Sequence, residues 1–372
     1  MAIVPVAPVP STPTAASIVD NACRTAKGSP PMNRFPASTA TPLRGGPTLR
    51  WGVLAPGRIA AAFVETLHTN SDQRMHAVAS RSYERAAAFG ARFGIDRAHD
   101  SYERLVSDPG IDIVYVAAPH SEHRALALLA IAAGKHVLIE KPIALTATEA
   151  REIADAARAA GVFVMEAMWA RFLPQTTVIA TLIADGMLGD IGLVAADYGS
   201  IFDFDPVSRA FNPALGGGSL LDLGVYPIWF AHFVLGRPSR VVASGSITST
   251  GVDGQAAILF STANGAEAQL SASMLVSTPV RATVSGSLAS IDIDAPFVAP
   301  GGFTLYRDGT DEPLRWDDPT SLRWRDGLVW QATAAAQHVA DGMTESPLHP
   351  LDTSIAVLET IDEARRQLGL LG

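Results

Sequence analysis

Cysteine is almost absent from this sequence, since Cys23 is the only one among 372 residues. A single cysteine excludes an intramolecular disulfide and a cysteine-based metal cage, and it favours a reducing compartment, so we expect a cytoplasmic protein. Basic residues are also scarce, because 28 Lys and Arg oppose 37 Asp and Glu and leave a formal net charge of -9. This charge repels phosphate backbones and anionic lipids. We therefore expect no nucleic-acid partner and no membrane partner.

Long apolar runs and an export signal are lacking as well. The apolar run at residues 125–134 is much shorter than the roughly 20 residues of a membrane-spanning helix. Residues 1–48 hold 9 of the 25 prolines and show no sustained periodicity, which predicts a mobile tail. Three prolines in the first ten positions argue against a secretory signal. Met32 supports the hypothesis that translation starts there, which the intact mass of the native protein would test.

Residues 49–168 alternate short apolar runs with helical patterns, which is typical of βα units around a parallel sheet. Thr146 is the expected N-cap of one helix, with Glu149 completing a capping box. The pattern predicts an α/β chain that opens with a Rossmann, doubly wound dinucleotide-binding domain. We predict strands at 49–54, 75–80, 113–117, 136–139 and 162–166, and helices at 58–68, 84–93, 122–133 and 146–160.

Residues 169–372 predict a C-terminal α+β domain with a large open, mainly antiparallel sheet, whose last helices pack back on the first domain. Helices are too few to cover both faces of this sheet, so we expect a second copy of the chain on the free face, in a homodimer or higher homo-oligomer. The strand-like runs are 194–204, 240–248, 256–261, 268–274 and 280–293, and the helical patterns lie near 177–185, 222–235, 328–342 and 354–367.

The first predicted strand leads into a variant of the Gly-x-Gly-x-x-Gly/Ala turn of dinucleotide-binding domains. Ala55 stands where the first glycine is usual, and Gly57 is the point where the backbone would approach a pyrophosphate at a helix N-terminus. A merely structural tight turn is the alternative, but the position between a strand and a helix favours cofactor binding. We therefore expect cofactor contacts from Ala55, Gly57, Arg58 and Ile59.

The second predicted strand ends in Ser80 and Arg81, where an NAD enzyme would carry Asp or Glu for the ribose hydroxyls. A hydroxyl beside a guanidinium suits a phosphate better, so we predict NADP rather than NAD. The alternative is that Arg81 is an ordinary solvated residue at the start of a helix.

Ala118, Pro119, His120 and His123 follow the third predicted strand, where nicotinamide and ribose contacts gather in such sheets. We expect all four at the cofactor. For each histidine, a polar cap near a helix start is the alternative.

The next strand delivers Glu140 and Lys141 to the same edge of the sheet, and Pro142 then ends the regular structure. The Lys141 ammonium could stabilise the alkoxide formed or consumed during hydride transfer. A lysine at a strand end is often plain surface, but the preceding cofactor turn favours a catalytic role. We expect both Glu140 and Lys141 to line the cofactor cleft.

A glycine-rich stretch at 216–218 precedes a predicted helix with Asp222 and Tyr226, which are four residues apart and so share a helix face. The Tyr226 phenol could donate a proton if a nearby ammonium lowers its pKa. The alternative is a core tyrosine beside a helix-start aspartate.

These stretches, in this order, resemble the glucose–fructose oxidoreductase/inositol dehydrogenase (Gfo/Idh/MocA) family over residues 49–372, and most of all its dimeric dihydrodiol dehydrogenase branch. The resemblance implies that Lys141 is the catalytic lysine, that Asp222 is the family's carboxylate and that Tyr226 is the acid/base, with NADP as cofactor. It also implies a pocket-shaping segment at 165–172. We expect Trp169, Arg171 and Phe172 there to bind substrate, Trp169 above all.

Together these patterns predict metal-free, NADP-dependent hydride transfer to or from a secondary alcohol or carbonyl of a sugar, polyol or cyclic diol. In this hypothesis Lys141 stabilises the reacting oxygen, Tyr226 passes the proton, and Asp222 holds substrate or tunes Tyr226. One alternative is a non-catalytic NADP-binding sensor of the same fold, which the presence of Lys141 and Tyr226 disfavours. Another is an enzyme with tightly held cofactor that shuttles hydride between two sugars.

Overall fold

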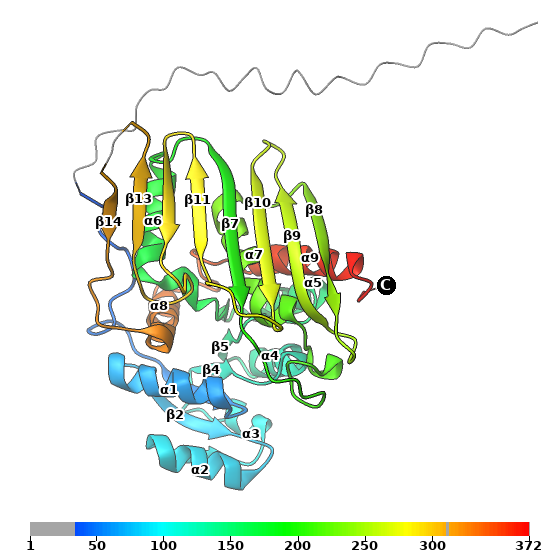
Figure 1. Cartoon of the computed structure of the whole chain (residues 1–372). Coiled ribbons are helices and arrows are strands. Elements are labelled where there is room, and N and C mark those ends of the chain that lie inside the picture. The colour runs from blue at the N-terminus through cyan, green and yellow to red at the C-terminus, as the bar shows by residue number, and fades with distance from the viewer. Residues whose placement is uncertain (1–33, 310–311, 372) are drawn as a thin grey trace, which may run out of the picture.

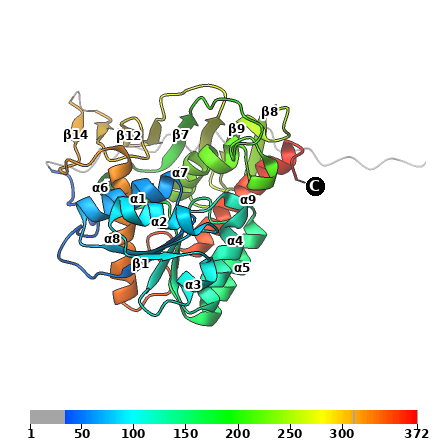
Figure 2. The same ribbon diagram turned by 90° about the horizontal axis from the view of Figure 1, so that it is seen from below.

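The computed structural model describes residues 34–309 and 312–371, which form two sheets with helices between and around them (Figures 1 and 2). The predicted α/β class, with a Rossmann sheet followed by a large open sheet, is confirmed. The predicted tail over residues 1–33, including Met32, lies outside the described residues.

The first sheet has six parallel strands in the order β3-β2-β1-β4-β5-β6. The chain runs outward from β1 through β2 and β3, then returns to place β4 on the other side of β1. This reversal opens a crevice at the carboxyl ends of β1 and β4, where such sheets bind ligands. The strands are β1 (Arg50–Leu54), β2 (Arg74–Ala79), β3 (Arg97–His99), β4 (Ile113–Val116), β5 (His136–Ile139) and β6 (Val164–Glu166).

Helices cover both faces of this sheet and bury apolar sides against it. They are α1 (Arg58–Asn70), α2 (Tyr83–Phe93), α3 (Tyr102–Val106), α4 (His123–Ala132) and α5 (Ala147–Ala160). Strand β3 and helix α3 were not predicted, because three and five residues are too few to show a period.

The Thr146 side chain accepts a hydrogen bond from the Glu149 amide, so the predicted N-cap of α5 is confirmed. The Glu149 carboxylate, however, accepts from the Leu145 amide at 3.0 Å. In a capping box this carboxylate would accept from the amide of the N-cap, Thr146. Its partner here is instead the residue before the N-cap.

The second sheet has eight strands in the order β14-β13-β12-β11-β7-β10-β9-β8. Strands β7 and β10 pair in parallel and the other neighbours pair antiparallel. The strands are β7 (Ile191–Gly199), β8 (Arg240–Ile247), β9 (Asp253–Ser261), β10 (Glu267–Ser273), β11 (Ala282–Gly286), β12 (Ala289–Ile293), β13 (Phe303–Arg307) and β14 (Leu314–Trp316). The predicted single run 280–293 is wrong, because it contains the turn of a β11–β12 hairpin, which Gly286 and Ser287 signal in the sequence, and β13 and β14 were not predicted.

Helices lie on one face of the eight-stranded sheet, between it and the Rossmann sheet (Figures 1 and 2). They are α6 (Pro174–Ala184), α7 (Val225–Leu235), α8 (Leu328–Ala340) and α9 (Leu351–Gln367). Helix α9 also contacts α5, where Asp362 accepts a hydrogen bond from the Ala147 amide at 2.8 Å. Within the described residues no helix covers the opposite face of the sheet, which faces the viewer in Figure 1.

Residues 34–48 are packed against the rest of the chain, contrary to the predicted mobile tail. The Phe35 ring meets the Phe303 ring edge-on at 5.2 Å, and the Ser38 hydroxyl lies 2.9 Å from that of Thr177. Further along, Arg44 pairs with Asp72 at the end of α1. These contacts are made by single side chains without regular secondary structure, so the sequence has no periodicity from which to predict them.

The segment Pro213–Leu235 spans 23 residues with a mean hydropathy of 1.3, long and apolar enough to cross a membrane. It exceeds the short run on which the sequence-based expectation rested. In the structure 83% of its most apolar window is buried between the two sheets, so its hydrophobicity is that of a core helix.

Candidate active site

A cavity of about 740 Å³ lies at the carboxyl edge of the Rossmann sheet and is roofed by residues from the second sheet and its helices. Every residue predicted to bind cofactor lines it, and so do Trp169, Asp222 and Tyr226. Side chains from segments more than a hundred residues apart therefore share one space. The predicted cofactor residues that line it are Ala55, Gly57, Arg58, Ile59, Ser80, Arg81, Ala118, Pro119, His120, His123, Glu140 and Lys141.

Gly57 is the N-cap of helix α1 and is exposed to the cavity. Its φ of -109° is open to any residue, and a Cβ built there would meet nothing closer than the Ala55 carbonyl oxygen at 3.9 Å. Neither backbone conformation nor packing inside the chain therefore requires glycine at this position. A pyrophosphate is a group that such a helix start can accommodate, and the missing side chain of Gly57 leaves room for it to approach the first amides of α1.

Ala55 is the strained residue of the same turn, because its φ of 61° lies in the left-handed region that favours glycine. Replacing Ala55 with Gly is expected to raise the free energy of unfolding by about 0.5–1 kcal/mol, since the relief of strain exceeds the entropy cost of glycine. Urea denaturation would measure this. Ala61→Gly inside α1 is the matched control, expected to destabilise by about 0.5–1 kcal/mol. Equal destabilisation by both variants would contradict the strain.

The far end of the cavity carries the predicted phosphate-binding residues. Ser80 and Arg81 follow β2, and Arg85 lines the same wall one turn into α2. Arg81 lies against the phenol of Tyr102, and burial raises the pKa of that phenol. Ser82, Arg85 and Tyr102 were not predicted: Ser82 is the N-cap of α2, and Arg85 and Tyr102 lie within α2 and α3, where single side chains give no motif.

The two predicted histidines brace backbone from inside the cavity wall. His123 is fully buried, with Nδ1 2.8 Å from the Pro142 carbonyl oxygen and Nε2 2.9 Å from that of Ala118. His120 Nδ1 lies 2.9 Å from the Gly216 carbonyl oxygen. Burial lowers the pKa of His120 to about 3, so its imidazole is neutral near pH 7.

Lys141 and Asp222 form the centre of the site. The Lys141 Nζ donates to the Asp222 backbone carbonyl at 2.6 Å and to Oδ1 at 3.2 Å, while Arg209 donates to Oδ2 at 3.2 Å. Burial by itself raises the pKa of Asp222, but Lys141 and Arg209 overcome this and hold it below its usual range. Asp222 is therefore an ionised carboxylate, and Lys141 keeps one of its three N–H donors for another partner.

Asp222 and Tyr226 reach the cavity from a helix whose start is fixed by a buried carboxylate. Asp253 accepts hydrogen bonds from the Ser219 hydroxyl at 2.7 Å and the Leu220 amide at 2.6 Å. Asp222 lies in a π-helical turn, Leu220–Gly224, and Tyr226 lies four residues later, in α7. Such turns are common at functional sites, and both side chains line the cavity.

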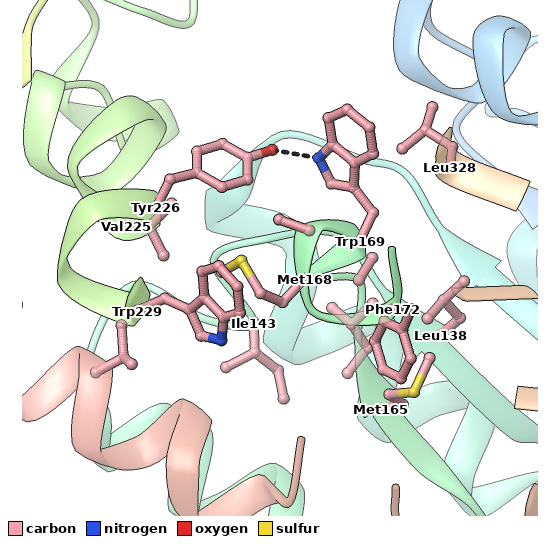
Figure 3. Close-up of a cluster of buried hydrophobic side chains, with 14 of the residues drawn as sticks. Leu138, Ile143, Met165, Met168, Trp169, Phe172, Val225, Tyr226, Trp229 and Leu328 are labelled. Carbon is pink, nitrogen blue, oxygen red and sulfur yellow. Dashed lines mark hydrogen bonds between the residues drawn. The ribbon is translucent and has the colours of Figure 1, made fainter. Parts of the chain in front are cut away.

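The Tyr226 hydroxyl accepts a hydrogen bond from Trp169 Nε1 at 2.8 Å (Figure 3). The condition considered for Tyr226, a nearby ammonium that lowers its pKa, is not met, since burial and then the charge of Glu140 raise that pKa. The reason is geometric, because Lys141 Nζ lies over the ring face, 4.9 Å from its centroid. Tyr226 is therefore a neutral phenol whose O–H has no acceptor among the described residues.

Glu140, the residue before Lys141, also lines the cavity. It is buried, and its carboxylate accepts a hydrogen bond from the Tyr115 hydroxyl. Burial raises the pKa of Glu140, so this carboxyl holds its proton more tightly than an exposed one.

Two residues expected to bind substrate do not line the cavity. The Arg171 guanidinium donates to the Leu348 carbonyl oxygen at 2.8 Å and lies over the Phe233 ring. Phe172 packs in the apolar cluster beneath the site (Figure 3). The 3₁₀ turn that contains both residues, Trp169–Phe172, directs only Trp169 toward the cavity, so the structure does not bring Arg171 and Phe172 together with the other predicted site residues.

Several cavity residues were missed because they come from separate segments with no local motif. Trp324 has an unusual backbone conformation, a φ of 46° in a non-glycine residue, which the sequence does not indicate. The missed residues on the second-domain side are Tyr198, Ser200, Phe202, Arg209, Leu223, Trp324, Arg325 and Leu328.

Comparison with known proteins agrees with this geometry. Residues 49–168 match an oxidoreductase family with an NAD-binding Rossmann fold, and residues 177–292 match the GFO/IDH/MocA C-terminal domain. A trans-1,2-dihydrobenzene-1,2-diol dehydrogenase from Mus musculus is 34% identical over 87% of this chain and 97% of its own length.

Two solved structures share the whole architecture. An aldose-aldose oxidoreductase from Caulobacter crescentus, complexed with glycerol, has a TM-score of 0.76 at 26% identity, covering 86% of this chain and 97% of that one. A 3-ketoreductase from Actinomadura kijaniata, in complex with TDP-benzene and NADP, has a TM-score of 0.70 at 28% identity over 86% and 97% of the two chains. This chain belongs to the Gfo/Idh/MocA family of NAD(P)-binding oxidoreductases, and it is a dehydrogenase.

Proposed function

We propose that this protein catalyses reversible, NADP-dependent hydride transfer to or from a secondary alcohol or carbonyl of a sugar, polyol or cyclic diol. The observation that carries the proposal is the meeting of Lys141, Asp222 and Tyr226 in the same cavity as the Gly57 turn. Ser80 and Arg81 at the far end of that cavity support NADP, because they offer a hydroxyl and a guanidinium where NAD would need a carboxylate.

Two donors in the site remain available for a substrate oxygen. One is the third N–H of Lys141, and the other is the O–H of Tyr226, whose oxygen already accepts from Trp169. During carbonyl reduction Lys141 would stabilise negative charge on the substrate oxygen, and Tyr226 would give it a proton. The ionised Asp222 holds Lys141 in place. The bound nicotinamide supplies or accepts the hydride.

The walls around these donors fit a ring-shaped substrate. Trp169, Tyr198, Phe202 and Tyr226 line this part of the cavity, and the Tyr198 and Tyr226 rings lie 5.4 Å apart. Aromatic faces pack well against sugar or carbocyclic rings. The names of the relatives, a diol dehydrogenase and an aldose oxidoreductase, agree with this class.

The test is a screen of the purified protein with NADP⁺ against aldoses, polyols and trans-cyclic diols, followed by the absorbance of the reduced nicotinamide. Turnover of at least one class is expected. Tight NADPH binding without turnover of any of them would instead favour the non-catalytic sensor.

Tyr226→Phe should lower kcat for carbonyl reduction by about 10²–10⁴-fold, the range of a lost general acid. The raised pKa of Tyr226 keeps the donor form at high pH. The wild-type reduction rate should therefore not fall through Tyr226 ionisation until above about pH 10, the ordinary tyrosine pKa. Rate profiles of both proteins would measure this, and a decline near pH 8 present only in the wild type would contradict it.

The bare face of the eight-stranded sheet supports a homodimer. Val242 and Leu259 are paired neighbours there and remain 39% and 50% exposed. We expect the wild type to sediment as a dimer at micromolar concentration, and Leu259→Lys to sediment as a monomer because it places a charge inside the contact. Thr262→Lys, in the β9–β10 turn, is the control. A wild-type monomer would refute the assembly.

A further inference from the structure

The loop that follows Lys141 is held by side chains at two consecutive residues. His123 Nδ1 meets the Pro142 carbonyl oxygen at 2.8 Å, and the Ile143 amide donates to Glu166 Oε1 at 2.9 Å. The Ile143 side chain is buried in the apolar cluster under Tyr226 and Trp229 (Figure 3). The backbone immediately after Lys141 is therefore fixed from several directions.

Glu166 is an unusual residue for this place, because a carboxylate there is surrounded by core. It is the last residue of β6, 1% exposed, between the fully buried Met165 and Ala167. Its Oε2 lies 2.9 Å from His349 Nε2, and the Ser354 hydroxyl lies 3.1 Å from the same nitrogen. Burial raises the pKa of Glu166, but these partners and the Ile143 amide lower it below its usual range, so the group is ionised.

Fold stability by itself does not require a charged side chain at this place. Burying a charge and its partners is costly, and well-packed apolar side chains of similar volume often stabilise a core as well or better. What an apolar residue could not do is accept the Ile143 N–H, which lies two residues beyond the ammonium. The contact therefore serves the geometry of the loop.

The partner of Glu166 comes from the C-terminal segment. His349 lies just before α9, and Ser354 lies in its first turn. The same segment reaches β6 once more, since the Val164 amide donates to the Thr344 carbonyl oxygen at 3.0 Å. Residues 344–354 thus fix both ends of the short strand that holds Glu166.

We infer that Glu166 and His349 are positioning residues for the reaction: the C-terminal segment orients Glu166, Glu166 clamps the Ile143 amide, and the clamp sets the position of the Lys141 ammonium. The inference rests on the proposed function. It assigns no contact with substrate or cofactor to either residue.

Glu166→Gln is the sharpest test because it keeps the shape of the side chain. A glutamine has one acceptor oxygen, so it cannot accept from Ile143 and His349 in the way that two carboxylate oxygens do. Hydrogen–deuterium exchange of peptide 140–146 should become about 10-fold faster. With the substrate found in the screen, kcat should fall about 10- to 100-fold, the effect of a small misplacement, while the NADPH Kd stays within about twofold.

Two further variants separate positioning from stability. His349→Phe removes the donor and should reproduce the loss of kcat, whereas His349→Gln supplies an amide N–H and should restore much of it. Gln73→Met is the matched control. Gln73 is buried and accepts a hydrogen bond from Trp51 Nε1 at 3.0 Å at the amino-terminal end of β1, away from the cavity. It should lower the melting temperature without changing kcat or the exchange of peptide 140–146.

The outcomes are distinguishable. Unchanged exchange of peptide 140–146 in both Glu166→Gln and His349→Phe overturns the clamp, whatever the activity. Faster exchange with unchanged kcat overturns the catalytic role of the clamp. A wild type that turns over no substrate overturns the proposed function itself, and with it the role of the clamp in the reaction, although the exchange result would still report the contact.

Discussion

Replacing Lys141 with methionine is expected to lower kcat by about 10³-fold, because the variant loses the cation that stabilises charge on the substrate oxygen. Methionine has a similar length and is apolar, so it can fill the space against the Tyr226 ring face that Lys141 now occupies. Asp222 keeps its ion pair with Arg209. NADPH affinity should therefore change little, and tryptophan fluorescence titration beside steady-state kinetics would measure both quantities.

The matched control is Lys135→Met, the same chemical change at the other end of β5. Lys135 Nζ donates to the backbone carbonyls of Asp108 and Ile111, each at 2.8 Å, and it does not line the cavity. This variant should lose stability and keep its kcat. A kcat of Lys141→Met equal to that of the wild type would contradict the proposed mechanism. An equal loss of kcat in both variants would mean that the loss comes from a general effect on folding.

The sequence predicts the Rossmann half well because its physical rules are local. Buried parallel strands are continuous apolar runs, as in Ile113–Val116, and every such run ends at the same sheet edge. The glycine turn, Arg81, His123 and Lys141 all follow strand ends, so predicting the strands also predicts that these residues meet.

The second half of the cavity could not be predicted in the same way. Tyr198, Arg209 and Arg325 come from a strand, an irregular loop and a 3₁₀ turn, and only the tertiary fold brings them together. Direction within a turn is equally hidden, since Trp169 faces the cavity and Arg171, two residues later, faces Leu348.

Electrostatic predictions failed where they depended on the exact approach of two groups. A lysine near a tyrosine can lower the pKa of the phenol, which was the condition considered for Tyr226, but Lys141 lies over the ring face while the hydroxyl faces Trp169. Burial then dominates and raises the pKa of Tyr226. Tyr226 is therefore a neutral proton donor, and its hydrogen bond from Trp169 fixes the orientation of its hydroxyl.

Arg81→Asp is expected to weaken NADPH binding by about 10- to 100-fold, the equivalent of the roughly 1.5–3 kcal/mol of hydrogen bonds to a charged group. The guanidinium lies at the end of β2, where the 2′-phosphate of NADP would be held. The new carboxylate would repel that phosphate and could accept from the free ribose hydroxyls of NAD. NADH affinity should therefore stay level or improve, which fluorescence titration with both nucleotides would show.

Arg92→Asp is the control for this charge reversal, because Arg92 lies on helix α2, which begins two residues after Arg81, but does not line the cavity. It changes net charge by the same amount, so any long-range repulsion of a polyanionic cofactor appears in both variants and falls with added salt. A loss confined to Arg81→Asp and to NADPH identifies a direct phosphate contact. Equal losses in both variants would mean that only the general field of the protein is involved, and an NADPH affinity untouched by Arg81→Asp would contradict the NADP assignment.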